Sequence, residues 1–213
     1  NGTISTVAGN GTSAFSGDGG AAINASLSGP RGVAVDSDGT LYIADTGNNS
    51  VRKVDTNGTI TSILSFMFSF GLDQPFSVAL GPGSRLYVAD YGHHRVLAMT
   101  LADGNITTVA GTGVAGYDGD GGPAVDAKLI FPTNVAVSPA GVLYISMPNE
   151  RVVRRVSTAG IIDRFAGDGS FSFSGDGGPA VQAAFSSPRV GGIDLAGTVY
   201  IADLYNHVIR AVG

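Results

Sequence analysis

The chain has 213 residues, no cysteine and a formal net charge of −5 at pH 7, and only 14% of its residues are charged. The missing cysteines exclude disulfides and thiolate metal sites, and the acidic balance argues against a nucleic-acid-binding protein, whose footprint is a basic face. There is no run of about 18 apolar residues, so we expect no membrane insertion.

The chain opens with a strand-like segment and a glycine-rich link. NGTISTVAG (1–9) has the apolar and β-branched content of a strand, and the link that follows reads FSGDGGAAINASLSGP (15–30). Close copies of the link occur at 117–132 and 173–188. The link therefore recurs along the chain, as expected of a repeat protein.

Four similar units follow the first link, at approximately 30–64, 75–111, 132–167 and 188–213. Each begins with a proline-led strand, continues with a tyrosine strand such as LYIAD (41–45), and then has a third strand such as SVRKV (50–54). The first three units add a fourth strand, such as GTITSIL (58–64). Units of four short strands at a long period predict the blades of a β-propeller.

The segment GPRGVAVDSDGTLYIADTGNNSVRKVDTNGTITSI (29–63) resembles the NHL repeat, and the GDGGPA insert is similar to the version common in bacterial-type NHL arrays. The resemblance covers nearly the whole chain. It implies a β-propeller, and rings of this family more often have six blades. It leaves function open, because such propellers serve as binding platforms, as sensor domains and occasionally as enzymes.

The last unit ends after its third strand, and the segment 1–9 has the pattern of the missing fourth strand. We therefore expect an all-β propeller of four four-stranded blades that forms a single domain over 1–213, with the last blade completed by the N-terminal strand. Two alternatives remain open. The segment 1–9 completes the last blade of a neighbouring subunit by strand exchange, or the chain is part of a larger propeller.

The glycine-rich link does not have the residues of a ligand loop. A phosphate loop needs a following lysine and a helix, and a calcium loop needs several oxygen ligands. We expect Asp18, Asp120 and Asp176 to be turn residues that bond their own backbone. The alanine-rich segment after each of them predicts a short helical turn packed on the blades. In GGPAVDAKL (121–129), for example, proline stands at the first helical position.

Other polar residues recur at fixed places in the repeat. Asp45, Asp90 and Asp203 end the second strand, where we expect turn anchors. We expect Arg52, Arg154 and Arg210, which share one place in the third strand, to bond carbonyls or carboxylates within the sheet. The three histidines, His93, His94 and His207, are too few for a zinc site with three or four convergent ligands. We therefore expect no catalytic residue, metal site or cofactor, and no enzyme.

Six asparagines begin the glycosylation sequence Asn-X-Ser/Thr, namely Asn1, Asn10, Asn24, Asn48, Asn57 and Asn105. An acceptor of this kind is an exposed loop residue in a secreted protein. Together with the low charge, the sequons predict a secreted extracellular protein that carries N-linked glycans.

An apolar stretch, LSFMFSFGL (64–72), stands where the second unit lacks its glycine-rich link. Its large side chains, Phe66, Met67, Phe68 and Phe70, are either ordinary packing or an exposed contact patch for a partner.

The sequence thus predicts a non-enzymatic extracellular structural or interaction module with protein partners, including copies of itself assembled into a fibre or matrix. One alternative is a ligand- or glycan-binding sensor domain that uses the channel mouth, lined by Tyr91, His93, Tyr205 and His207. Another is a metal-dependent lyase or hydrolase.

Overall fold

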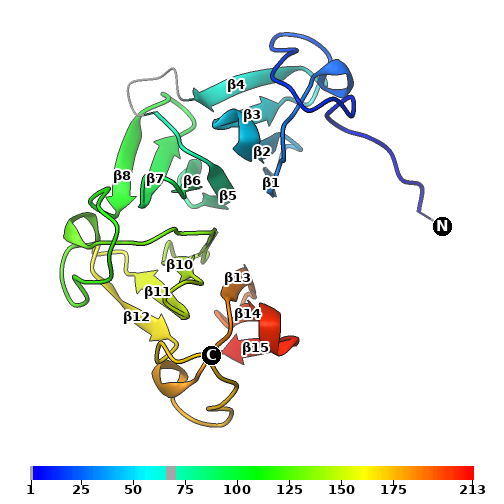
Figure 1. The fold of residues 1–213 in the computed structure, drawn as a ribbon. Helices are drawn as coiled ribbons and strands as arrows, with labels where there is room; N and C mark the ends of the chain where they lie inside the picture. The colour runs from blue at the N-terminus through cyan, green and yellow to red at the C-terminus, as the bar shows by residue number, and fades with distance from the viewer. Residues whose placement is uncertain (1, 66–70) are drawn as a thin grey trace. The chain divides into compact units, whose positions relative to one another are not determined.

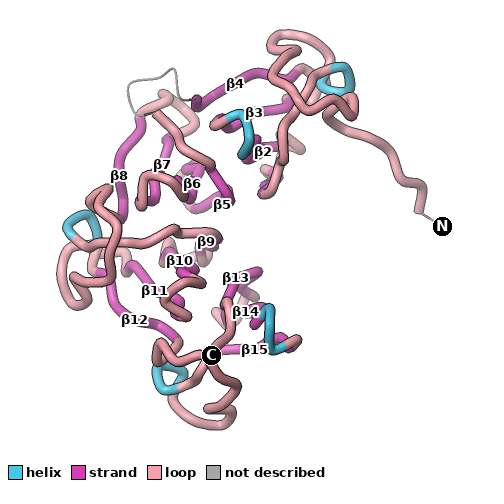
Figure 2. Tube along the Cα trace, viewed as in Figure 1, coloured by secondary structure: helices cyan, strands magenta, loops and turns pink. Residues whose placement is uncertain are grey.

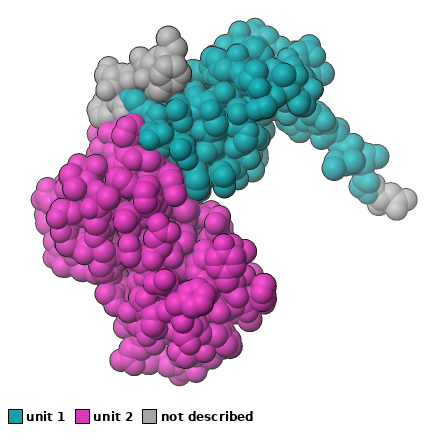
Figure 3. Space-filling model, in the orientation of Figure 1, with its two compact units in different colours: residues 1–78 teal, residues 79–213 magenta. Residues whose placement is uncertain are grey.

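The computed structural model describes residues 2–65 and 71–213, and these residues form an all-β protein with four antiparallel sheets. The only helices among them are five 3-10 turns of three residues each. The chain divides into two compact units, residues 1–78 and 79–213 (Figure 3).

The first unit contains one complete sheet and the start of the next. Its strands are β1 (Gly32–Val35), β2 (Leu41–Asp45), β3 (Ser50–Val54) and β4 (Ile60–Ser65), which pair in chain order (Figure 1). Strand β5 (Pro75–Gly81) begins at the end of this unit.

The second unit contains the remaining sheets. One sheet joins β5 to β6 (Arg85–Asp90), β7 (Arg95–Thr100) and β8 (Ile106–Ala110). The next is formed by β9 (Asn134–Val137), β10 (Leu143–Met147), β11 (Val152–Val156) and β12 (Ile162–Ala166), and the last by β13 (Pro188–Ile193), β14 (Val199–Asp203) and β15 (Val208–Val212). The expected all-β architecture of four blades is confirmed.

The last blade differs from the expectation in one respect. It has three strands, and residues 2–8, expected to add the fourth, lie in no strand. In Figure 1 this N-terminal segment extends away from the sheet of β1 to β4. Residues 2–7 are exposed, and no backbone hydrogen bond to them is found among residues 2–65 and 71–213, so they lack the ladder of bonds that defines a strand.

Successive blades of the second unit pack face to face, and this packing follows one rule. Each blade turns its tyrosine face, which contains Tyr87 or Tyr144, toward the leucine and isoleucine face of the following blade. Tyr87 shares a core with Leu143 and Ile145, and Tyr144 shares a core with Val199 and Ile201. Strands such as β10 are therefore buried on both faces, which explains why their sequences do not alternate.

The three glycine-rich links form the expected short helical turns, η1 (Ala22–Asn24), η3 (Ala124–Asp126) and η4 (Ala180–Gln182), shown in cyan in Figure 2. Two details differ from the expectation. Pro123 and Pro179 precede the helical turn in an extended conformation instead of opening it, and one apolar residue of each turn, Ile23, Val125 or Val181, is exposed to solvent.

Candidate functional site

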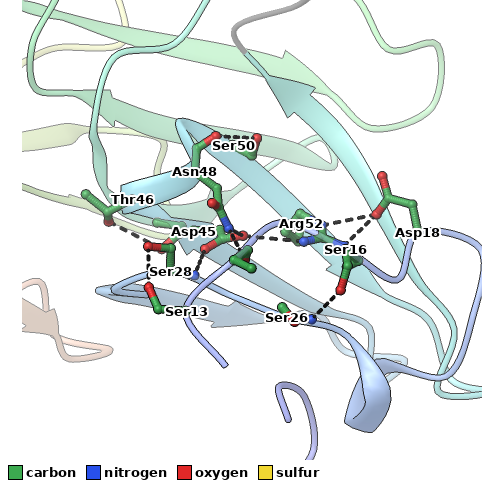
Figure 4. A network of polar contacts seen from close by, with 12 residues as sticks. Ser13, Ser16, Asp18, Ser26, Ser28, Asp45, Thr46, Asn48, Ser50 and Arg52 are labelled. Carbon is green, nitrogen blue, oxygen red and sulfur yellow. Dashed lines mark hydrogen bonds and ion pairs between the residues drawn. The ribbon is translucent and has the colours of Figure 1, made fainter. Parts of the chain in front are cut away.

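A buried arginine ties each glycine-rich link to its own blade. In the first blade, the fully buried Arg52 donates to Asp18 Oδ1 at 2.7 Å and to the carbonyl of Ser16 at 3.0 Å (Figure 4). Arg154 bonds Asp120 Oδ1 at 2.6 Å in the same way, and Arg210 bonds Asp176 Oδ1 at 2.7 Å. The arginines bond carboxylates and carbonyls, as expected, but these partners lie in the link and not within the sheet, where they were expected.

The aspartates of the link have a different role from the one expected. Asp18, Asp120 and Asp176 accept hydrogen bonds from these arginines, which lie 34 residues further along the chain. The prediction that they bond their own backbone was wrong, because the nearest charged donor is a buried guanidinium, which makes the stronger hydrogen bond.

Asp45 and Asp203 anchor the turns after the second strand, as expected. Asp45 Oδ1 accepts from the Ser28 amide at 2.7 Å, and its Oδ2 accepts from Asn48 Nδ2 at 2.8 Å (Figure 4). In the last blade, Asp203 accepts from the Ser186 amide at 2.6 Å and from Asn206 Nδ2 at 2.8 Å. These carboxylates are fully buried and use both oxygens for structure.

Two titratable side chains of the link before the third blade have shifted pKa values, and the structure explains both shifts. Burial raises the pKa of Tyr117, whose hydroxyl accepts from Arg164 Nε at 2.8 Å. The hydrogen bond from the Lys128 side chain lowers the pKa of Asp118. The first shift arises from burial and the second from a hydrogen-bond partner within the link, so the fold itself accounts for both.

The described histidines do not form a metal site. His93 Nδ1 lies 3.1 Å from the buried Asp90 carboxylate, and His94 Nδ1 accepts from the Phe131 amide. No group of three or more histidine, cysteine, aspartate or glutamate side chains that could hold a metal occurs in residues 2–65 and 71–213.

A backbone requirement explains where two of the histidines occur. Four residues that align before the third strand take left-handed conformations, with φ between 50° and 58°: Asn49, His94, Arg151 and His207. Of the residues expected at a channel mouth, Tyr91 stacks on Phe131 at 4.7 Å, whereas Tyr205 is exposed and its amide donates to the Ser186 carbonyl.

The strongest candidate for a binding surface is the open end of the last blade. Its tyrosine face, formed by Tyr200, Ala202, Ile209 and Ala211, is uncovered. Ile209 is 71% exposed, whereas Val153 at the same place in the third blade is 0% exposed. A surface that the repeat buries elsewhere is thus open to solvent in this structure, which makes it a candidate interaction surface.

Next to this face, the outer edge of β15 and the link before the blade enclose a groove of about 600 Å³. Phe173, Asp176, Gly178 and Pro179 line the link side, and Val208 to Gly213 line the strand side. Asp176 has 69% of its side chain exposed, compared with 34% for Asp120 in the blade that has a fourth strand. The groove therefore corresponds to the place that β12 fills in the third blade.

A second open surface belongs to the first unit. Val33 and Val35 lie on the same face of the sheet as Ile43, on the leucine and isoleucine side of the first blade. Val33 is 65% exposed, whereas Val135, its counterpart in the third blade, is 6% exposed. The first unit thus presents the kind of face that, in the second unit, packs on a tyrosine face.

The candidate glycosylation sites differ in their exposure and in their hydrogen bonds. Asn24, Asn57 and Asn105 are exposed. Asn10 Nδ2 donates to the Asn24 carbonyl, and Asn48 Nδ2 donates to Asp45 and to the Ala14 carbonyl. Asn1 and the expected contact patch of Phe66, Met67, Phe68 and Phe70 lie outside the described residues.

The repeated sheets, their face-to-face packing and their links define an NHL-type β-propeller. Residues 4–77 match a family model described as the Teneurin NHL domain. Teneurin-4 of Mus musculus is 32% identical over 92% of this chain, and Teneurin-m of Drosophila melanogaster is 29% identical over 95%. The chain belongs to the NHL-repeat β-propeller family, and it spans 8% of the length of these two relatives.

Solved structures agree on the fold. A protein of unknown function from Bacteroides thetaiotaomicron has a TM-score of 0.72 at 22% identity, over 85% of this chain and 46% of that chain. A chain of a nidogen/laminin complex has a TM-score of 0.62 at 16% identity, over 86% of this chain and 58% of that chain. A virginiamycin B lyase from Staphylococcus aureus has a TM-score of 0.57 at 14% identity, over 86% of this chain and 55% of that chain. The fold therefore occurs both in protein complexes and in an enzyme, and it does not by itself decide the function.

Proposed function

We propose that this chain is a non-enzymatic structural and interaction module of an extracellular protein, and that it associates with copies of itself. The observation that carries the proposal is the pair of open faces. One is the tyrosine face of the last blade, which contains Tyr200 and Ile209, and the other is the face of Val33 and Val35 on the first blade.

The packing of consecutive blades in the second unit indicates how a tyrosine face and a leucine and isoleucine face fit together. Tyr144 and Val153 of one blade pack on Val199 and Ile201 of the next. Tyr200 and Ile209 are chemically similar to Tyr144 and Val153. Val33 lies on the leucine and isoleucine face of the first blade, which is the kind of face that packs against a tyrosine face in the second unit. We infer that the last blade of one copy packs on the first blade of another, as consecutive blades do within one chain. Burial of these apolar side chains drives the association.

Two features, the relatives and the exposed sequons, support the extracellular setting. The relatives that the chain matches are teneurins, and Asn24, Asn57 and Asn105 are exposed sequons. Among the described residues, no helix has the length and hydropathy needed to cross a bilayer. The recurrent arginines and aspartates are occupied by structural bonds, which supports a non-enzymatic role.

The test is the effect of one charge on assembly. Light scattering across a wide concentration range should show the mass of the wild-type chain rising with concentration. Ile209→Asp should keep the chain monomeric, because it places a carboxylate where an apolar contact forms, and its melting temperature should be unchanged because Ile209 is exposed.

Leu195→Asp is the matched control for this test. Leu195 is another exposed apolar residue of the last blade, and it lies in the turn between β13 and β14 instead of in a strand of the tyrosine face. This variant should assemble like the wild type. Equal assembly of all three proteins would contradict the role of the face.

A further inference from the structure

We propose that the cleft between the second and third blades, called here the inter-blade cleft, binds a small aromatic carboxylate. It lies between β6 and β8 on one side and β10 and β11 on the other (Figure 1), and all of its lining residues belong to the second unit. The inference goes beyond the proposed function and does not depend on the two open faces.

The inter-blade cleft has the size and the apolar lining of a small-molecule site. Its volume is about 410 Å³, and such sites typically have about 300–1,000 Å³. Its buried lining residues are Tyr87 of the second blade and Leu143 and Val156 of the third, which share one core. The link between the two blades adds Pro123 and Val125. An apolar ligand body that contacts these side chains is removed from water, which favours binding.

Three polar side chains of the cleft have unused hydrogen-bonding capacity. In the part of the chain that the structure describes, the Arg85 guanidinium and the hydroxyls of Tyr87 and Thr108 form no hydrogen bond or ion pair. Tyr87 is only 7% exposed, and polar groups of such buried side chains normally have a hydrogen-bond partner. A ligand with acceptor atoms would supply that partner.

The charge of the cleft favours an anion. Of the described residues that line it, Arg85 alone carries a charge, and none has a carboxylate, although the whole chain has a net charge of −5. A guanidinium binds a carboxylate through two parallel hydrogen bonds. Arg85 and Tyr87 lie two residues apart on β6 and therefore on one face of the sheet, with the guanidinium carbon 5.9 Å from the ring centroid. A carboxylate on Arg85 thus places the body of the ligand beside the Tyr87 ring.

The next pair of blades shows which groups fit beside such a tyrosine. Between the third and fourth blades, Phe165 packs edge-to-face on Tyr144 with ring centroids 4.8 Å apart, and Arg155 bonds the Asp163 carboxylate at 2.9 Å. In the second blade, the corresponding places of Phe165, Arg155 and Asp163 hold three smaller residues, Val109, Ala98 and Thr107. The protein's own aromatic ring and carboxylate are thus replaced by smaller groups beside Tyr87, and an aromatic carboxylate restores both.

The arginine of the cleft is particular to the second blade. The residue before the LYVAD strand is Arg85, whereas the other three blades have Thr40, Val142 or Thr198 at this place. The small residues that leave space beside Tyr87 and the cation that binds an anion therefore occur together in one blade.

The experiment titrates the intact chain with 3-phenylpropanoate and, as a neutral probe of the same shape, with 3-phenylpropanamide. Binding is measured by NMR from the amide resonances of β6 and β10, at protein concentrations where the chain is monomeric. The acid should shift these resonances, and the amide should bind about tenfold more weakly or worse, because it lacks the charge that pairs with Arg85.

Two arginine variants test the role of the guanidinium, with melting temperature as the check of folding. Arg85→Gln should weaken binding of the acid about tenfold, to the level of the amide. Arg155→Gln is the matched control, because Arg155 lies on the third blade and does not line the cleft, and it should bind the acid like the wild type. Equal binding of the acid by the wild type and by Arg85→Gln would overturn the proposal.

A third variant tests the space beside Tyr87. Val109→Phe introduces the ring that Phe165 supplies in the third blade, so it should block both probes while the chain stays folded. Unchanged binding in Val109→Phe would place the acid elsewhere and overturn the site, as would an absence of resonance shifts up to the solubility limit of the acid. Association through the blade faces is tested separately by Ile209→Asp, so failure of this site leaves it in place.

Discussion

Arg154 shows how a single residue holds a link to a blade. Its side chain is fully buried, and it donates to Asp120 and to the carbonyls of Asp118 and Lys128. Removing one partner of a buried pair is costly because the other charge and the carbonyls lose their donors.

We expect Arg154→Ala to lower the free energy of unfolding by about 3 kcal/mol. The control is the next residue, Arg155, whose ion pair with Asp163 is 42% exposed on both sides. Arg155→Ala should cost about 1 kcal/mol or less. Urea unfolding of both variants measures the difference, and equal losses would contradict the role assigned to Arg154.

The arginine contact was missed from sequence because its partners are 34 residues apart. One signal was nevertheless present in the repeat. The second unit has Leu97 in place of the arginine, and it is also the unit that lacks the glycine-rich link with its aspartate. Arginine and aspartate are thus present together or absent together, as expected for a charged pair of which neither member is stable alone.

At the scale of the element, the links depend on glycine for two separate reasons. Gly119 and Gly121 both have positive φ, 87° and 85°. A Cβ at Gly119 would lie 2.7 Å from the Ala127 Cα, whereas a Cβ at Gly121 would meet nothing within 4 Å. Gly119 therefore serves a close backbone approach as well as a turn, and Gly121 serves the turn alone.

Alanine substitution separates these two effects. Gly121→Ala should cost about 1–2 kcal/mol, the price of a left-handed conformation. Gly119→Ala should cost more, by about 1–3 kcal/mol, because the backbone of the helical turn must move. Thermal or urea unfolding of the two variants checks the order, and a larger loss for Gly121→Ala would contradict the assignment.

The strands were predictable because their residue pattern is repeated, and Tyr42, Tyr87, Tyr144 and Tyr200 all occupy second strands as expected. The open faces were not predictable from the residues. Ile209 and Val153 are chemically alike, and only the presence or absence of a following blade decides which of them is buried. The same holds for the N-terminal segment, whose pattern predicts a strand but does not name the edge to which it is added.

At the scale of the whole molecule, the chain has few charges and a net charge of −5. We expect N-linked glycans on Asn24, Asn57 and Asn105, which are exposed, and none on Asn48, because its Nδ2 is a donor within the polar network of Asp45. Intact mass before and after enzymatic removal of the glycans, on material secreted from eukaryotic cells, measures the occupancy. A mass equal to that of the bare chain would contradict the prediction.

The burial of second strands in the second unit has a consequence for the substitutions that the fold accepts. All five residues of β10 are buried, so this strand has no solvent-facing side on which a charged side chain could lie. In the second unit, sequence change is therefore expected in the links and turns before it is expected in such a strand.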